Sequence, residues 1–135
     1  MKLVCPDCGK SELETIRQKH NFTYGVGTTA EKITAVLPFR HCPGCGLRFL
    51  DHEGEEAMHE AFCRHLGVMT PSEIKKLRQS YGLSRKEFAQ LTRFGEAPIA
   101  RWERGALIQN AANDQLLRLL SFPENLARLR HSDRS

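Results

Sequence analysis

The sequence predicts an α+β fold built from two small domains. Two matched Cys-x-x-Cys knuckles, at 5–8 and 42–45, enclose a segment rich in β-branched residues and glycine. The second half changes to short segments of helical periodicity with clear capping residues. We therefore expect a small zinc-ribbon-like antiparallel β domain with a linker helix over 1–67, and a five-helix domain over 68–135.

The knuckles carry the clearest chemistry in the chain. Each has two residues between its cysteines, a proline after the first cysteine and a glycine after the second. Four thiolates from two such turns complete the tetrahedral shell of a structural zinc ion. The spacing thus predicts one Zn²⁺ per chain, held by Cys5, Cys8, Cys42 and Cys45.

Disulfide bonds and redox chemistry are the alternatives for these cysteines. The N-terminus shows neither the apolar stretch of a secretory signal nor a membrane span. In a reducing cytoplasm, which we expect for this chain, Cys-x-x-Cys pairs favour metal over disulfide. A thioredoxin-like site needs one such pair within a βαβ pattern, and the sequence lacks that pattern.

Between the knuckles we expect strands at 14–18 and 32–37, with a glycine-containing turn over 23–28. Gly25-Val26-Gly27 is not a dinucleotide-binding fingerprint, because it lacks the third glycine and no helical pattern follows it.

A helix is predicted over 54–66. Its apolar face contains Ala57, Met58, Ala61, Phe62 and Leu66. On the same helix, His59 and Cys63 are four residues apart and could share a metal. The apolar surroundings favour packing for both, and Cys63 needs no role beyond a core residue.

Short helices with recognisable ends follow. Thr70 and Ser84 each begin a capping box, and Gly82 ends the first of these helices. Further helices are expected over 96–104, over 113–121 with Leu116, Leu117, Leu119 and Leu120, and after Pro123. Trp102 is expected to anchor the core.

The second domain is also the basic half of the chain. Residues 68–135 carry twelve Lys or Arg against seven Asp or Glu, whereas residues 1–67 carry eight against nine. Short helices joined by a tight connection, together with this charge, indicate a helix-turn-helix that meets DNA. Its third helix would then enter the major groove.

We expect Arg101 to read base edges, because its guanidinium can donate two hydrogen bonds to guanine. Ala97, one turn earlier, could only contact a thymine methyl, and Glu96 completes the candidate set on this helix. Phosphate contacts are expected from side chains at the start of the second helix and in the connection: Arg85, Lys86 and Arg93. Glu103 should pair inside the domain, next to Arg104, and point away from DNA.

The stretches Leu83-Ser84-Arg85-Lys86-Glu87-Phe88-Ala89-Gln90-Leu91 and Ile99-Ala100-Arg101-Trp102-Glu103-Arg104-Gly105 resemble Xre-type helix-turn-helix domains of the phage-repressor kind. Together with the CPxCG pair, nearly the whole chain resembles the MqsA-type antitoxins (YgiT-type zinc finger plus Xre-family helix-turn-helix).

The resemblance implies a bacterial antitoxin and transcriptional regulator. Family members bind structural zinc through cysteines matching these four, and they dimerise through the C-terminal domain on a palindromic operator, which represses their own operon. In the best-known member the N-terminal domain also binds the toxin, an mRNA-cleaving ribonuclease. They read bases with an Asn and an Arg; the Arg matches Arg101, but Ala97 stands at the Asn position. The operator sequence is therefore not expected to be shared.

The sequence leaves two other classes of function as alternatives. A zinc-stabilised regulator or protein-interaction adaptor without a toxin would show no salt-dependent affinity for DNA. A metalloenzyme ranks lower, because four thiolates leave no open coordination position and no nucleophile arrangement is visible. We therefore expect no enzymatic activity.

Overall fold

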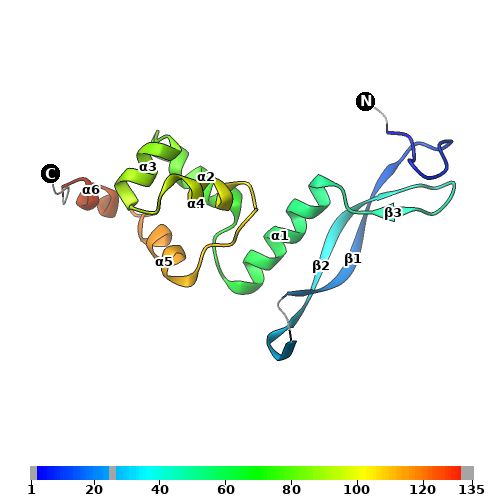
Figure 1. Ribbon diagram of the computed structural model, residues 1–135, viewed down its shortest axis with the longest axis horizontal. Coiled ribbons are helices and arrows are strands. Elements are labelled where there is room, and N and C mark those ends of the chain that lie inside the picture. The colour runs from blue at the N-terminus through cyan, green and yellow to red at the C-terminus, as the bar shows by residue number, and fades with distance from the viewer. Residues whose placement is uncertain (1–2, 25–26, 132–135) are drawn as a thin grey trace. The chain divides into compact units, whose positions relative to one another are not determined.

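The computed structural model describes residues 3–24 and 27–131. The chain divides into two compact units, Met1–His65 and Leu66–Ser135. Within the described residues, a three-stranded antiparallel sheet precedes six α-helices (Figure 1). The predicted α+β class, with a cysteine cluster in the N-terminal part, is confirmed.

A long twisted hairpin forms most of unit 1. Strands β1 (Glu14–Tyr24) and β2 (Glu31–His41) pair antiparallel over their whole length, from Glu14 opposite His41 to Tyr24 opposite Glu31. The short strand β3 (Arg48–Phe49) pairs with the end of β2. Both long strands exceed the predicted segments, because cross-strand pairing carries polar residues that propensity alone does not assign to a strand.

The turn between these strands is described only in part. A single 3₁₀ turn, η1 (Gly27–Thr29), precedes β2, whereas Gly25 and Val26 of the expected glycine turn lie outside the described residues.

Helix α1 (His52–Leu66) packs against one face of the hairpin. The Phe62 ring lies 5.0 Å from the Phe22 ring and 4.9 Å from the Tyr24 ring, centroid to centroid. Near the start of α1, Gly54 is buried, and a Cβ atom there would lie 2.8 Å from the Pro38 carbonyl oxygen. Helix and strand can therefore approach this closely only without a side chain at Gly54.

Unit 2 contains α2 (Pro71–Ser80), α3 (Arg85–Thr92), α4 (Glu96–Glu103), α5 (Ala111–Leu119) and α6 (Pro123–His131). Thr70 and Ser84 form the two predicted capping boxes in front of α2 and α3. Helix α5 begins two residues earlier than expected, because the Asn110 side chain accepts a hydrogen bond from the Asn113 N–H and caps it.

The core of unit 2 is one cluster contributed by all five helices. Its buried members are Ile74, Leu77, Phe88, Ala89, Ile99, Trp102, Leu117, Leu120 and Leu126. Trp102 is buried, as predicted. Leu119 is 49% exposed, because it lies on the outer side of the last turn of α5. Leu66, expected on the inner face of α1, is also exposed at 39%.

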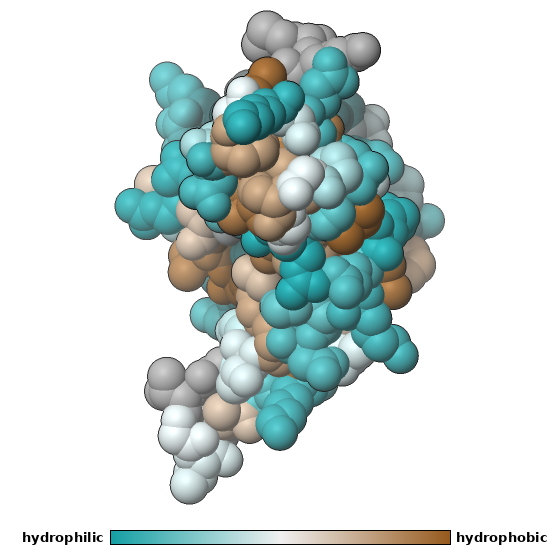
Figure 2. Space-filling model, turned by 90° about the vertical axis from the view of Figure 1, so that its right-hand side faces the viewer, coloured by the Kyte–Doolittle hydropathy of each residue, from teal (hydrophilic) through white to brown (hydrophobic). Residues whose placement is uncertain are grey.

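The surface drawn in Figure 2 is mainly hydrophilic, with hydrophobic side chains in separate patches. None of the described helices is a candidate membrane span.

Candidate metal centre and nucleic-acid interface

The two knuckles bring four sulfur atoms together at one end of the sheet. The ligand atoms of Cys5, Cys8, Cys42 and Cys45 all lie within 4.8 Å of one another. Two of the distances between knuckles are 3.7 Å, from Cys5 Sγ to Cys45 Sγ, and 3.6 Å, from Cys8 Sγ to Cys42 Sγ. A tetrahedron with metal–sulfur bonds of about 2.3 Å has edges of about 3.8 Å. The cluster therefore has the size of a four-thiolate metal site.

Both knuckles have the same backbone geometry. The Gly9 N–H donates to the Cys5 carbonyl at 3.0 Å, and the Gly46 N–H donates to the Cys42 carbonyl at 2.9 Å. Each glycine has a positive φ, 67° and 81°, which explains why the motif ends in glycine. Backbone N–H groups also approach the sulfurs, from Asp7 to Cys5 Sγ and from Cys45 to Cys42 Sγ, both at 3.4 Å.

These backbone groups favour thiolates. The Cys45 N–H is the main influence that lowers the pKa of Cys42 to about 6, and the N–H groups of Lys10 and Ser11 lower the pKa of Cys8. The Leu47 N–H also acts to lower the pKa of Cys45. The hydrogen bond with Cys42 and burial outweigh it and raise that pKa to about 12. Four thiolates this close require a cation between them, and the donor set is the one that zinc prefers.

Other metal-binding side chains of unit 1 stand apart from this cluster. His41 Nδ1 lies 2.8 Å from Glu14 Oε1 on the neighbouring strand. Cys63 is buried, and burial lowers the pKa of His59. Among the described residues, the four cysteines are the only group of three or more such side chains placed to hold a metal.

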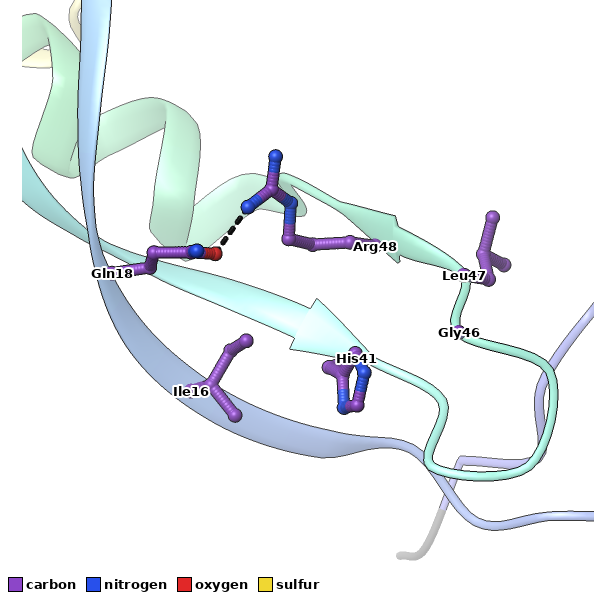
Figure 3. A pocket seen from close by; sticks show the side chains of 6 residues that line it. All are labelled: Ile16, Gln18, His41, Gly46, Leu47 and Arg48. Atoms are coloured by element: carbon purple, nitrogen blue, oxygen red, sulfur yellow. Dashed lines mark hydrogen bonds between the residues drawn. The ribbon is translucent and has the colours of Figure 1, made fainter.

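An open hollow of about 660 Å³ lies beside the second knuckle, between β1 and the segment leading into β3 (Figure 3). Arg48 donates a hydrogen bond to Gln18 across it, and its guanidinium carbon lies 4.8 Å from the centre of the Phe39 ring. Ile16 and Leu47 add apolar surface. Sequence reasoning did not find this hollow, because its lining residues come from three segments without a shared motif.

In unit 2, α3 and α4 are joined by a tight connection of three residues, Arg93 to Gly95. Arg93 and Gly95 both have positive φ, 66° and 89°. Between them, Phe94 turns inward, with its ring 5.0 Å from the Trp102 ring and perpendicular to it. The connection is thus fixed by backbone geometry on its outer side and by aromatic packing on its inner side.

Helix α4 has a buried face and an exposed face. Ile99 and Trp102 are almost fully buried in the core. Glu96, Ala97 and Arg101 are exposed. The side chain of Arg101 forms no hydrogen bond or ion pair with any residue that the structure describes. The helix therefore presents an unpaired guanidinium while its other face holds it to the unit.

Glu103 ties three helices together from inside. Its side chain is 1% exposed and accepts two hydrogen bonds from Arg78 of α2, at 2.7 and 2.9 Å. Arg85 of α3 donates a third at 3.2 Å. Burial alone would raise the pKa of Glu103, but the bonds and charge of Arg78, with those of Arg85, outweigh it and hold this pKa below its usual range.

The remaining basic candidates lie around α3. Lys86 and Arg93 are exposed, and their side chains form no hydrogen bond or ion pair within the described part of the chain. Arg85, expected at phosphate, is 45% exposed and already donates one nitrogen to Glu103. Arg104, by contrast, does not share in the Glu103 network.

Comparison with known proteins gives one match. The model of a family described as the antitoxin component of a bacterial toxin–antitoxin system, MqsA, matches residues 1–130. The matched range includes both the cysteine cluster and the helix-turn-helix. No curated protein matches the chain.

Proposed function

The chain belongs to the MqsA antitoxin family, and we propose that it is a zinc-stabilised, sequence-specific DNA-binding repressor that also neutralises an RNA-cleaving toxin. The family membership agrees with the resemblance read from the sequence and gives the protein an antitoxin role with a toxin partner. The specific DNA contacts, the dimer and the nature of the toxin are proposed on the grounds below.

The observation that carries the DNA-binding proposal is the two-faced α4. Ile99 and Trp102 anchor the helix, while Arg101 is exposed on its outer side and has no side-chain partner among the residues that the structure describes. An arginine placed in this way can donate two hydrogen bonds to guanine O6 and N7 in the major groove. Lys86, Arg93 and the free part of Arg85 supply positive charge beside α4 for phosphate.

A palindromic operator requires two copies of α4, about 34 Å apart for successive major grooves. We propose a homodimer formed through unit 2. Leu119 and Phe122, around the end of α5, are 49% and 58% exposed, which is unusual for such apolar side chains in neighbouring turns. A second copy covering them would remove this apolar surface from water.

We propose that unit 1 holds both the zinc ion and the surface that binds the toxin. Four thiolates at tetrahedral spacing favour one structural Zn²⁺ per chain, with Cys5, Cys8, Cys42 and Cys45 as ligands. The hollow lined by Arg48, Ile16 and Leu47 gives this unit a concave surface of mixed chemistry, of the kind that accommodates a protein side chain. We propose that the toxin binds on unit 1.

The DNA proposal is tested by fluorescence anisotropy of the full-length protein on the DNA upstream of its own gene, at two salt concentrations. Selective binding that weakens steeply with salt is expected. Arg101→Ala should lose about 1–3 kcal/mol of base discrimination.

Arg128→Ala is the matched control, because it removes an equal charge from α6. It should leave base discrimination unchanged. Absent or unselective binding by the unaltered protein would refute the repressor proposal and turn attention to a protein partner for α4.

A further inference from the structure

The two carboxylates of α4 lie in opposite environments. Glu103, the last residue of the helix, is buried and bound by two arginines. Glu96, its first residue, is exposed, and its side chain has no hydrogen bond or ion pair within the described part of the chain. The exposed side of α4 therefore presents one acceptor, Glu96, and one donor, Arg101, neither of which has a side-chain partner among the described residues.

A free carboxylate is unfavourable on a surface that meets phosphates, because like charges repel. Base edges are different. In the major groove the N4 amino group of cytosine is a hydrogen-bond donor, and a glutamate is a suitable acceptor for it. The N-terminal residues of a recognition helix are the ones that reach base edges, and Glu96 holds that position in α4.

We propose that Glu96 determines specificity by selecting a cytosine in each half-site of the operator. The inference rests on the proposed entry of α4 into the major groove. Glu96 and Arg101 are five positions apart, which is about 7.5 Å along a helix axis. This length matches about two base-pair steps of about 3.4 Å. The half-site thus contains a cytosine about two base pairs from the guanine bound by Arg101.

Ala97 fits the same arrangement. It is exposed beside Glu96 and offers only a methyl group, which suits contact with a thymine methyl. With Ala97 unable to hydrogen-bond, Glu96 is the group at the start of α4 that discriminates bases by hydrogen bonding.

A structural role for Glu96 makes a different prediction. A negative charge in the first turn stabilises a helix through its dipole, whatever the DNA sequence. Glu124 occupies the same kind of first-turn position in α6 and is also exposed. Glu124→Gln is therefore the matched control for the loss of a first-turn charge.

The experiment selects binding sites from a randomised double-stranded DNA library with the full-length protein, Glu96→Gln, Glu96→Ala and Glu124→Gln. Anisotropy with single-base variants of the enriched site then gives fold-changes. The unaltered protein and Glu124→Gln should enrich the cytosine, and any other base there should weaken binding between about fivefold and about 150-fold. Glu96→Gln should prefer adenine at that position, since glutamine pairs with adenine, and Glu96→Ala should show no preference there.

Two results would overturn the inference, and they differ. If the unaltered protein enriches a site but the Glu96 variants enrich the same bases at every position, Glu96 does not read DNA. Tighter binding of both variants to all sequences would then show simple repulsion from phosphate. If the unaltered protein enriches no site, the repressor proposal itself fails and the inference falls with it.

Discussion

The buried ion pair between Glu103 of α4 and Arg78 of α2 can be tested by replacing Glu103. Replacing it with glutamine leaves Arg78, whose side chain is only 10% exposed, without its counter-charge. Removal of one partner from a buried pair costs about 3–5 kcal/mol, because the remaining charge is left unpaired in a poorly solvated place. A unit of about 70 residues has a total stability of only about 4–10 kcal/mol. We therefore expect Glu103→Gln to remove about a third of the stability of unit 2 or more.

Trp102 makes this loss measurable in the intact protein. It is the only tryptophan of the chain and is buried in unit 2, so its fluorescence reports the unfolding of that unit. In thermal unfolding, the midpoint should fall by at least about 12 °C, at about 4 °C or more per kcal/mol for a unit of this size.

Two control variants separate the causes. Arg85→Gln breaks only the ion pair between Arg85 and Glu103. This pair contributes at most about 1 kcal/mol, because the Arg85 side chain is partly exposed. The double variant Arg78→Met, Glu103→Leu removes both buried charges and should be much less destabilised than Glu103→Gln. A loss below about 1 kcal/mol for Glu103→Gln would refute the reasoning, because the pair would then behave as a surface pair.

The same pair also predicts an acid dependence. The pKa of Glu103 is held below its usual range in the folded protein, so its contribution is fully present above the ordinary glutamate pKa of about 4.3. It is lost as the pH falls through the lower, folded pKa. The stability gap between the unaltered protein and Glu103→Gln should therefore narrow below about pH 4.3.

Other parts of the chain give further predictions. In denaturant unfolding, the free energy of unfolding should be about 1 kcal/mol higher for Arg93→Gly than for Arg93→Ala. Both variants lose the charge, but only glycine adopts the left-handed backbone conformation of this position without strain. Gly54→Ala should destabilise unit 1 by about 1–3 kcal/mol in urea unfolding followed by circular dichroism, although helix propensity alone predicts the opposite sign. Cys42→Ser should lower zinc content, measured by atomic absorption, below one ion per chain, whereas Cys63→Ser, outside the cluster, should not. Phe122→Asp should give a monomer in light scattering, whereas Leu107→Asp, an equally apolar exposed site, should not.

Local signals in the sequence were sufficient for the helices. Thr70 and Ser84 begin α2 and α3 through side-chain hydrogen bonds with residues three positions further on, so both helix starts can be predicted without knowing the fold. The cap at Asn110 follows the same rule, but a second asparagine, Asn113, offers a competing start, and the sequence alone predicts the helix from that residue. The cysteine cluster was equally accessible, since the spacing within each knuckle fixes its geometry.

Structural features that depend on residues distant in the sequence could not be predicted from it. The β1–β2 hairpin extends well past its β-branched residues because every added pair shares the register already set. The inward orientation of Glu103 was expected, but its partners were not: Arg78 lies 25 residues earlier, and no local rule connects them. For the same reason the sequence predicts only a phosphate contact for Arg85. The structure shows in addition that one nitrogen of its guanidinium binds Glu103.

The two units differ in what stabilises them. Among the described residues of unit 1, the buried apolar ones are Cys5, Ile33, Leu37, Phe39, Cys42 and Cys63, so two of these six are ligands of the proposed metal. Unit 2 has a cluster of nine buried side chains that needs no metal. A small unit whose core includes its ligands gains its folding energy from the metal. We therefore expect chelation to unfold unit 1 while the Trp102 fluorescence of unit 2 stays native. Loss of the proposed zinc ion would then abolish the toxin binding that we propose for unit 1 before it affected the helix that we propose reads DNA.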